Sequence, residues 1–426
     1  MLLTRKVNHN FYILARIATF GNILQQSIMK NIGKPIAWGF KALSKFPQYF
    51  ISSIIRRHTS VQKGLVVCWS YNFKQYSCNP KALTEHLLEH YPEFEIVWAF
   101  RDKVDISGID SRIKCVRYKS IEFLKAINTA EFLITNCRTH PYEIGWKKRP
   151  GQKYLMLWHG GMALKKIEKD VEEKLGYQYP RKAKADSKAC DLMISGCGFH
   201  TNLAKEKFWY DGEVLEKGLP RNDIFFDRAR HEDIRKNVCE AFGINPESKI
   251  ILYAPTFRKP ATIEPYRIGW QDVIPELKAA LNTPDVTVLL RLHPNLIGRF
   301  DTSSLINSPQ VKDATMYHDM HELLCASDML ITDYSSSMFD MTLLGRPCLL
   351  YATDAQQYDR GYYFELDSLP YPLAHNQDEL IEIIRTFNAE RHMKDCEKFD
   401  RQHIKSVECG KGSESLAQWM KAHTLL

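Results

Sequence analysis

The sequence predicts an α/β protein of two Rossmann-like, doubly wound lobes, preceded by a basic helical segment. From Gly64 onward, short apolar runs alternate with helical patterns, which is typical of parallel sheets covered by helices. A charged helical stretch at 231–242, followed by Gly243-Ile244-Asn245-Pro246, separates these runs into two groups. A chain of 426 residues is long enough for two such cores. We therefore expect two sheets with a cleft between them.

The expected parts are a basic, amphipathic helical segment at 1–62, a first lobe at 63–243 and a second lobe at 244–426. Apolar runs predict first-lobe strands at 65–69, 95–100, 113–117, 132–135, 154–157 and 192–195. The same criterion predicts second-lobe strands at 249–253, 286–292, 329–332 and 348–351. Helical patterns at 80–90 and 120–128 fall between first-lobe strands, as parallel strand connections require.

The N-terminal segment is unusually basic. Twelve Lys and Arg residues precede the first acidic residue, Glu85, and they exceed the net charge of +8, so the rest of the chain is net negative. Apolar and aromatic residues alternate with these cations, but no run of about 18 uncharged apolar residues is present. Helices of this composition bind the surface of anionic membranes. We expect such a membrane surface as partner; simple packing against the body is the alternative.

Nucleic acid is a less suitable partner for the basic segment. The body is net negative, and the chain contains no recognised nucleic-acid-binding motif. The eleven cysteines are scattered, without a CxxC pair or a Cys/His cluster at zinc spacing. They are typical of reduced thiols in the cytosol. We therefore expect no nucleic-acid partner and no metal site.

A candidate phosphate site follows the apolar run at 329–331. Thr332, Asp333, Tyr334, Ser335 and Ser336 come next, and a helical run begins at about Met338. The first turn of a helix has unpaired N–H groups and a positive dipole end, and serine hydroxyls add further donors. We predict that this segment holds the phosphates of an activated nucleotide donor without a metal. An ordinary helix cap is the alternative.

Three other strand ends carry reactive side chains. His293 follows the run at 286–292, and Arg258 follows the run at 249–253, where each could contact phosphate. In the other lobe, His159 follows the run at 154–157 and precedes Gly160 and Gly161. An imidazole in a glycine-rich turn is a suitable general base for an acceptor hydroxyl. A loop cap, a surface ion pair and a structural histidine are the respective alternatives.

A set of motifs in this order resembles the CDP-glycerol glycerophosphotransferases of teichoic acid synthesis. The motifs are His159-Gly160, Leu219-Pro220-Arg221-Asn222-Asp223, Tyr253-Ala254-Pro255-Thr256-Phe257-Arg258, Arg291-Leu292-His293-Pro294 and Ile331-Thr332-Asp333-Tyr334-Ser335-Ser336. An earlier segment, Tyr76-Ser77-Cys78-Asn79-Pro80, matches as well. Each motif is weak by itself, but the ordered set is specific and covers about Gly64 to Phe364.

The resemblance implies a metal-independent fold of the glycosyltransferase B (GT-B) type, without a cofactor, bound peripherally at the cytoplasmic face of the cell membrane. It implies transfer of glycerol phosphate from CDP-glycerol to a hydroxyl, with release of CMP. The acceptor would be a lipid-linked sugar, a growing polyol phosphate chain or a capsular glycan. The first lobe would then bind the acceptor, and the second lobe the nucleotide donor.

The resemblance also assigns roles to residues. His159 would be the base, His293 would bind or protonate the donor phosphates, and Ser335 with Ser336 would hold the diphosphate. Candidates for donor contacts or support are Arg258, Thr332, Asp333 and Asp340, with Arg221, Asn222 and Gly160 as further supporting residues. The chain departs from the family pattern at Gly161-Met162, where Thr-Pro is common.

Three other functions remain open from the sequence. A transferase of the same fold could use CDP-ribitol or a nucleotide sugar, because a phosphate site does not read the transferred group. A nucleic-acid-binding protein and a membrane scaffold without activity are more remote. Neither of these explains two histidines at strand ends of facing lobes.

Overall fold

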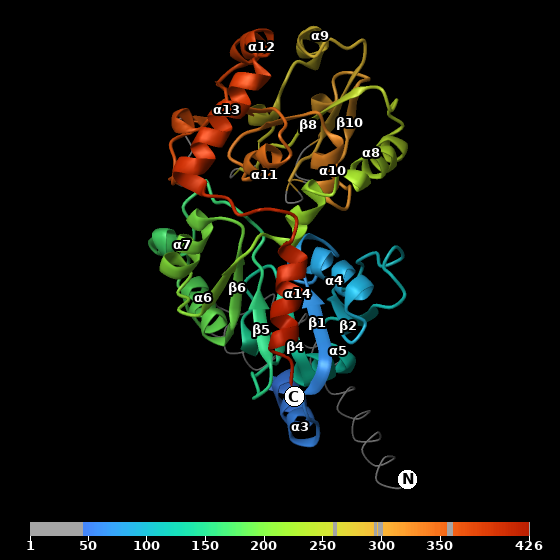
Figure 1. Ribbon diagram of the computed structural model, residues 1–426, viewed down its shortest axis with the longest axis vertical. Coiled ribbons are helices and arrows are strands. Elements are labelled where there is room, and N and C mark those ends of the chain that lie inside the picture. Colours follow the sequence, from blue (N-terminus) through green and yellow to red (C-terminus); the bar gives the residue numbers. More distant parts are fainter. Residues whose placement is uncertain (1–45, 259–261, 294–295, 297–300, 356–360, 426) are drawn as a thin grey trace, which may run out of the picture.

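The computed structural model describes residues 46–258, 262–293, 296, 301–355 and 361–425. These residues form two α/β lobes, one above the other in Figure 1, and each lobe is built on one parallel sheet. The predicted fold class of two doubly wound lobes is confirmed.

The first lobe contains a seven-stranded sheet of order β3-β2-β1-β4-β5-β6-β7. Its strands are β1 (Gln62–Trp69), β2 (Glu95–Phe100), β3 (Lys114–Arg117), β4 (Ala130–Thr135), β5 (Lys153–Met156), β6 (Leu192–Ser195) and β7 (Glu213–Glu216). The strand order reverses between β1 and β4, which is where open α/β sheets bind ligands beyond their carboxyl ends. Its helices are α3 (Phe46–His58), α4 (Cys78–His90), α5 (Ile121–Thr129), α6 (Gln178–Ala189) and α7 (Gly198–Lys207).

The second lobe contains a six-stranded sheet of order β10-β9-β8-β11-β12-β13. Its strands are β8 (Lys249–Tyr253), β9 (Val286–Leu290), β10 (Val311–Asp313), β11 (Met329–Thr332), β12 (Cys348–Tyr351) and β13 (Leu373–Ala374). The later helices are α8 (Arg228–Phe242), α9 (Trp270–Ala280), α10 (Met320–Ala326), α11 (Ser337–Leu343), α12 (Gln377–Thr386), α13 (Ala389–Phe399) and α14 (Gly412–Ala422). Short 3-10 turns join several of these elements, among them η3 (Pro220–Phe225).

All ten predicted strands are present, and their ends differ from the predicted ones by no more than three residues. They were predictable because central strands of a parallel sheet are buried on both faces and read as continuous apolar runs. The sequence did not predict β7, β10 and β13. These strands have only four, three and two residues, and β7 carries glutamates at both ends.

The lobe boundaries differ from the expected 63–243 and 244–426, because the chain crosses between the lobes earlier than expected and then returns. Helix α8 buries Ile234 and Val238 in the core of the second lobe. Helix α14 buries Leu416 and Met420 against first-lobe strands, and Figure 1 shows it (red) lying across that sheet. Thus α8 belongs to the second lobe and α14 to the first.

Helix α3 falls inside the expected membrane-associating segment, yet it packs on the first lobe. Ile51 and Ile55 are buried in the first-lobe core. The amide of Asn128 on α5 donates to Ser52 Oγ (3.1 Å) and accepts from Arg56 Nη1 (3.0 Å). The packing alternative therefore holds for 46–58, while residues 1–45 of the predicted segment lie outside the described residues. Within the described ranges, no helix is long and apolar enough to span a membrane.

Candidate active site

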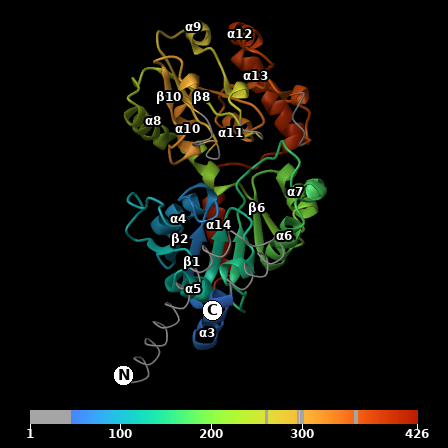
Figure 2. The same cartoon turned by 180° about the vertical axis from the view of Figure 1, so that it is seen from behind.

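The two lobes meet along the carboxyl ends of their sheets (Figure 2). Contacts between them include the ion pairs Lys81–Asp319 (2.9 Å) and Arg221–Asp340 (3.1 Å), and backbone pairing of residues 164–166 with 361–363. In that pairing, the N–H of Lys166 donates to Gly361 O (3.0 Å). The predicted residues of the first and second lobes are thus brought to one junction.

His159 lies just beyond β5, and a hydrogen bond to the backbone fixes the tautomer of its ring. Its Nδ1 is 2.9 Å from the backbone carbonyl of Asn136, and because a carbonyl only accepts, Nδ1 carries the hydrogen. The lone pair is therefore on Nε2. The ring has a solvent-exposed edge, but burial within the surrounding protein lowers its pKa, and the charge of Arg221 lowers it further. The imidazole is thus neutral and ready to accept a proton at neutral pH.

Arg221 connects His159 to the second lobe. Its Nη1 donates to the carbonyl of His159 (2.8 Å), and its Nη2 donates to both carboxylate oxygens of Asp340 on α11 (3.1 Å each). Asn79 completes the arrangement, because it accepts from the Arg221 N–H (3.0 Å) and donates to the carbonyls of Leu157 and Trp158. These bonds fix the loop that carries His159.

The closest approach of this loop to the neighbouring chain segment is at Gly161. A Cβ added to Gly161 would lie 2.9 Å from Leu219 Cδ1, so the loop passes very close to the segment that leads into η3. A Cβ on Gly160 would meet nothing closer than Met162 O at 3.6 Å. A side chain at position 160 would therefore fit, so the structure gives no steric reason for a glycine at Gly160. The close contact is at Gly161, where the sequence departs from the family pattern.

Thr332 and Asp333 point into the second lobe. The hydroxyl of Thr332 donates to Ala254 O (2.7 Å), and the carboxylate of Asp333 accepts from the N–H of Thr256 (3.0 Å). Both side chains are fully buried. They hold the turn after β11 against the turn after β8 and do not present a surface to a ligand.

Arg258 is held by the same turns. Its guanidinium pairs with Asp333 (2.6 Å) and Asp354 (2.8 Å) and lies over the rings of Tyr266 and Tyr334. The side chain is 6% exposed, and the two carboxylates raise its pKa far above the ordinary value against the opposing effect of burial. These contacts occupy the guanidinium, so it orders the turn that precedes Ser335.

Ser335 and Ser336 are the half-exposed members of the predicted phosphate segment. Ser335 Oγ accepts from Ser337 Oγ (2.9 Å) and from the Ser337 N–H (3.3 Å). Ser336 is the N-cap of α11, but its side chain makes no cap hydrogen bond. The cap alternative therefore does not account for the Ser336 hydroxyl.

His293 lies three residues beyond the end of β9 and is exposed. Its ring packs against Phe257 at a centroid distance of 5.8 Å, and its pKa is lowered by burial and by the charges of Lys165 and Arg291. Lys165 comes from the first lobe and reaches across, with its Nζ 5.8 Å from the ring centre of Tyr334. Arg291 itself donates to carbonyls of the loop after β10. Lys165 thus brings a positive charge from the first lobe to the ring of Tyr334, the residue before Ser335.

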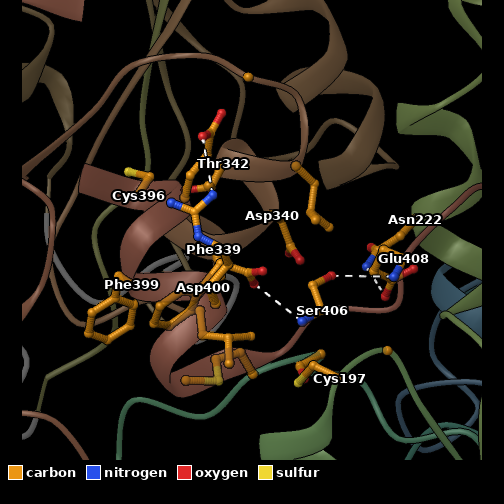
Figure 3. Close-up of a pocket in the computed structure, with 18 of the residues that line it drawn as sticks. Cys197, Asn222, Phe339, Asp340, Thr342, Cys396, Phe399, Asp400, Ser406 and Glu408 are labelled. Carbon is orange, nitrogen blue, oxygen red and sulfur yellow. Dashed lines mark hydrogen bonds and ion pairs between the residues drawn. The ribbon is translucent and has the colours of Figure 1, made fainter. Parts of the chain in front are cut away.

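A cavity of about 460 Å³ adjoins this junction, between the His159 loop, α11, α13 and the chain segment that returns to α14 (Figure 3). Asn222 and Asp340 line it together with Glu408. Asn222 Nδ2 donates to Glu408 Oε1 (2.9 Å), and the Leu219 N–H donates to Glu408 Oε2 (3.1 Å). Burial raises the pKa of Glu408 to about 7. Asn222 thus anchors the returning segment.

Three residues of this junction were not predicted from the sequence: Asn79, Asn136 and Lys165. A signal was present for each: Asn79 lies in the early Asn-Pro motif, Asn136 directly follows a predicted strand, and Lys165 lies in a basic stretch after the His159 loop. In the described part of the chain, no group of three or more His, Cys, Asp or Glu residues is arranged to hold a metal ion.

Comparison with known proteins identifies the family of this chain. The family model of the CDP-glycerol:poly(glycerophosphate) glycerophosphotransferases matches residues 51–419. A teichoic acid glycerol-phosphate transferase of Staphylococcus aureus is 30% identical over 93% of this chain and 99% of its own length. A teichoic acid poly(glycerol phosphate) polymerase of Bacillus subtilis is 31% identical over 77% of this chain but only 44% of its own length. The chain therefore spans less than half of that polymerase.

A solved structure of the wall teichoic acid polymerase TagF superposes with a TM-score of 0.77 at 27% identity, over 89% of this chain and 93% of the solved chain. Two parallel-sheet lobes that meet at a junction give the chain a fold of the GT-B type. The chain belongs to the CDP-glycerol:poly(glycerophosphate) glycerophosphotransferase family.

The raised pKa of Glu408 predicts a pH-dependent stability. Between its ordinary value of 4.5 and about 7, the folded chain holds a proton that the unfolded chain has lost, so stability falls as the pH rises through this window. Glu408→Gln cannot ionise. The Tm of the wild type minus the Tm of this variant should therefore decrease as the pH is raised from about 5 to about 8, as differential scanning calorimetry can measure. The exposed Glu365→Gln serves as control; a constant difference for Glu408→Gln would contradict the assignment.

Proposed function

We propose that this chain transfers glycerol phosphate from CDP-glycerol to an acceptor hydroxyl and releases CMP. The observation that carries the proposal is the connection between His159 and α11. Arg221 bonds the His159 carbonyl in the first lobe and Asp340 in the second, so the base lies across the junction from Ser335 and Ser336.

In the proposed reaction, the acceptor oxygen attacks the phosphorus that bears the glycerol. A new P–O bond forms to the acceptor, and the bond to the bridging oxygen breaks, so that CMP departs with the electron pair. His159 Nε2 takes the acceptor proton as the bond forms, a contribution of about 10²- to 10⁴-fold. The neutral state of the imidazole and the hydrogen on Nδ1 support this role.

The leaving CMP gathers negative charge, and the second lobe stabilises it. The hydroxyls of Ser335 and Ser336 and the start of α11 donate to the diphosphate. An imidazole N–H of His293 donates as well, and Lys165 supplies positive charge. Arg258, Thr332 and Asp333 act indirectly by ordering the turn before Ser335. Since these donors serve the diphosphate without a metal, we propose a metal-independent reaction.

The acceptor is proposed more broadly, as a lipid-linked or polymeric hydroxyl compound of the cell envelope, with capsular glycans among the candidates. The donor has a close alternative in CDP-ribitol or a nucleotide sugar, because the phosphate contacts do not read the transferred group. Mass analysis of products from CDP-glycerol and a defined lipid acceptor tests both points. If CMP were released from CDP-ribitol but not from CDP-glycerol, the donor would be CDP-ribitol.

We further propose that the enzyme works as a peripheral protein at the cytoplasmic face of the membrane. The basic and aromatic residues before Phe46 support this proposal. Helix α3 does not, because its apolar residues are buried in the first-lobe core.

His159→Ala should lower kcat by about 10²- to 10⁴-fold, because the proton acceptor is lost. CDP-glycerol should still bind, as isothermal titration calorimetry can measure, since His159 is not a donor contact. The exposed His375→Ala is the matched control and should keep full activity. Excess chelator should leave the wild-type rate unchanged. Loss of donor binding in His159→Ala would indicate a structural histidine, and a chelator-sensitive rate would contradict the metal-independent reaction.

Ser335→Ala combined with Ser336→Ala should weaken the affinity for CDP-glycerol by about 10²- to 10⁴-fold, because two hydrogen bonds to a charged group are lost and each contributes about 1.5–3 kcal/mol. The affinity is measured by calorimetry on His159→Ala, in which turnover is suppressed. The exposed Ser368→Ala should bind as before. Unchanged affinity in the double variant would remove the phosphate assignment.

Deletion of residues 1–45 should abolish flotation with vesicles of anionic phospholipid, because each cation near such a surface contributes about 1 kcal/mol. The catalytic body retains α3, so transfer to a water-soluble acceptor should persist. Vesicles of neutral phosphatidylcholine are the control. Equal flotation of the full and shortened chains would contradict the proposed membrane segment.

A further inference from the structure

The loop after β1 contains three consecutive non-glycine residues in the left-handed region: Tyr71 (φ 44°), Asn72 (φ 59°) and Phe73 (φ 69°). This conformation is unfavourable for L-residues, which normally adopt it singly. The N–H of Lys74 donates to Ser70 O (3.2 Å) and closes the turn. A run of this kind persists only where the surroundings impose it, which is common at functional sites.

The surroundings of this left-handed turn (residues 71–73) fix it on both sides. Phe73 is buried, and its ring stacks on those of Trp69 (5.4 Å) and Tyr118 (4.1 Å). The carbonyl of Asn72 accepts from Arg101 Nε (2.8 Å). With its last residue anchored in the core, the turn projects Tyr71 toward the junction between the lobes.

Asn136 joins the turn to His159. Its side-chain oxygen accepts from the Tyr71 N–H (2.9 Å), while its backbone carbonyl accepts from His159 Nδ1 (2.9 Å). The Tyr71 ring consequently lies beside the imidazole, with centroids 5.9 Å apart and planes at 57°. Trp158 also contacts the imidazole, at 4.4 Å. The base is thus in contact with two aromatic rings.

The phenol of Tyr71 stays protonated. Its pKa is raised well above the ordinary value, by burial first and by the neighbouring Cys78 thiol second, whereas Arg221 lowers it. The ring beside His159 is therefore neutral in any working buffer. An aromatic ring close to an imidazole that becomes cationic favours the cation.

We propose that Tyr71 is a positioning residue for His159: its ring restricts rotation of the imidazole, so that Nε2 stays aimed at the acceptor hydroxyl. This inference rests on the proposed role of His159 as base. The left-handed turn is then the structural cost of placing an aromatic ring beside the base, and Phe73 is its anchor. The hydroxyl group of Tyr71 is not needed for this role, whereas the ring is.

Kinetics of Tyr71 variants test the proposal. Tyr71→Leu removes the ring and should lower kcat by about 10- to 100-fold, because small misplacements of a reacting group cost this much. KM for CDP-glycerol should change by less than about twofold, since the donor contacts lie elsewhere. Tyr71→Phe keeps the ring and should restore kcat to within about threefold of the wild-type value. Tyr91→Leu is the matched control, because Tyr91 also lies 5.9 Å from a histidine, His86, which has no proposed role.

A second measurement does not depend on turnover. In protein labelled with ¹⁵N-histidine, and with His159→Gln for assignment, the wild type and Tyr71→Phe should show a single His159 tautomer with hydrogen on Nδ1. In Tyr71→Leu, the ¹⁵N chemical shifts of the His159 ring should be averaged between the two tautomers. If the leucine variant unfolds, Tyr71→Met is used in its place. Unchanged kcat and shifts in these ring-less variants, or equal losses in Tyr71→Phe, would overturn the positioning role. A wild type with this tautomer but no transfer from CDP-glycerol would instead overturn the proposed function alone.

Discussion

The site depends on one buried ion pair, that of Arg221 with Asp340. Both side chains are less than 10% exposed, so neither charge is hydrated and each depends on the other. Arg221 also donates to the His159 carbonyl, so one of the contacts that join the lobes also positions the proposed base. Removal of either partner leaves an unpaired buried charge, which typically costs about 3–5 kcal/mol. Lobe closure and the geometry of the base are therefore linked through one guanidinium.

Strand ends could be located from the sequence because buried parallel strands are apolar throughout and stop at polar residues. This places His159, His293 and the Thr332–Ser336 segment at the edges that meet at the junction. The direction of each side chain was not predictable. Thr332 and Asp333 turn inward and Ser336 does not, and only the contacts with the β8 turn decide this. For the same reason Arg258, expected as a phosphate ligand, is surrounded by two carboxylates.

Long-range packing accounts for the other differences. Helix α14 follows the second lobe in sequence, but its apolar face matches an uncovered face of the first sheet. Helix α8 likewise leaves the lobe in which sequence order would place it. Local patterns contain no information on which of two similar cores a helix joins. The left-handed turn at 71–73 could not be predicted from the sequence either, because it contains no glycine.

In the proposed reaction, the side chains that serve the donor phosphates come from both lobes, and this affects how transfer competes with hydrolysis. His293 belongs to the second lobe, while Lys165 reaches Tyr334 from the first, next to the backbone pairing with Gly361. An open enzyme would therefore lack one cation on the leaving group as well as the base. In the open enzyme, water could reach the diphosphate, but the leaving group would not be fully stabilised. Closure around an acceptor both adds the missing positive charge and excludes water. The same geometry would thus favour transfer over hydrolysis.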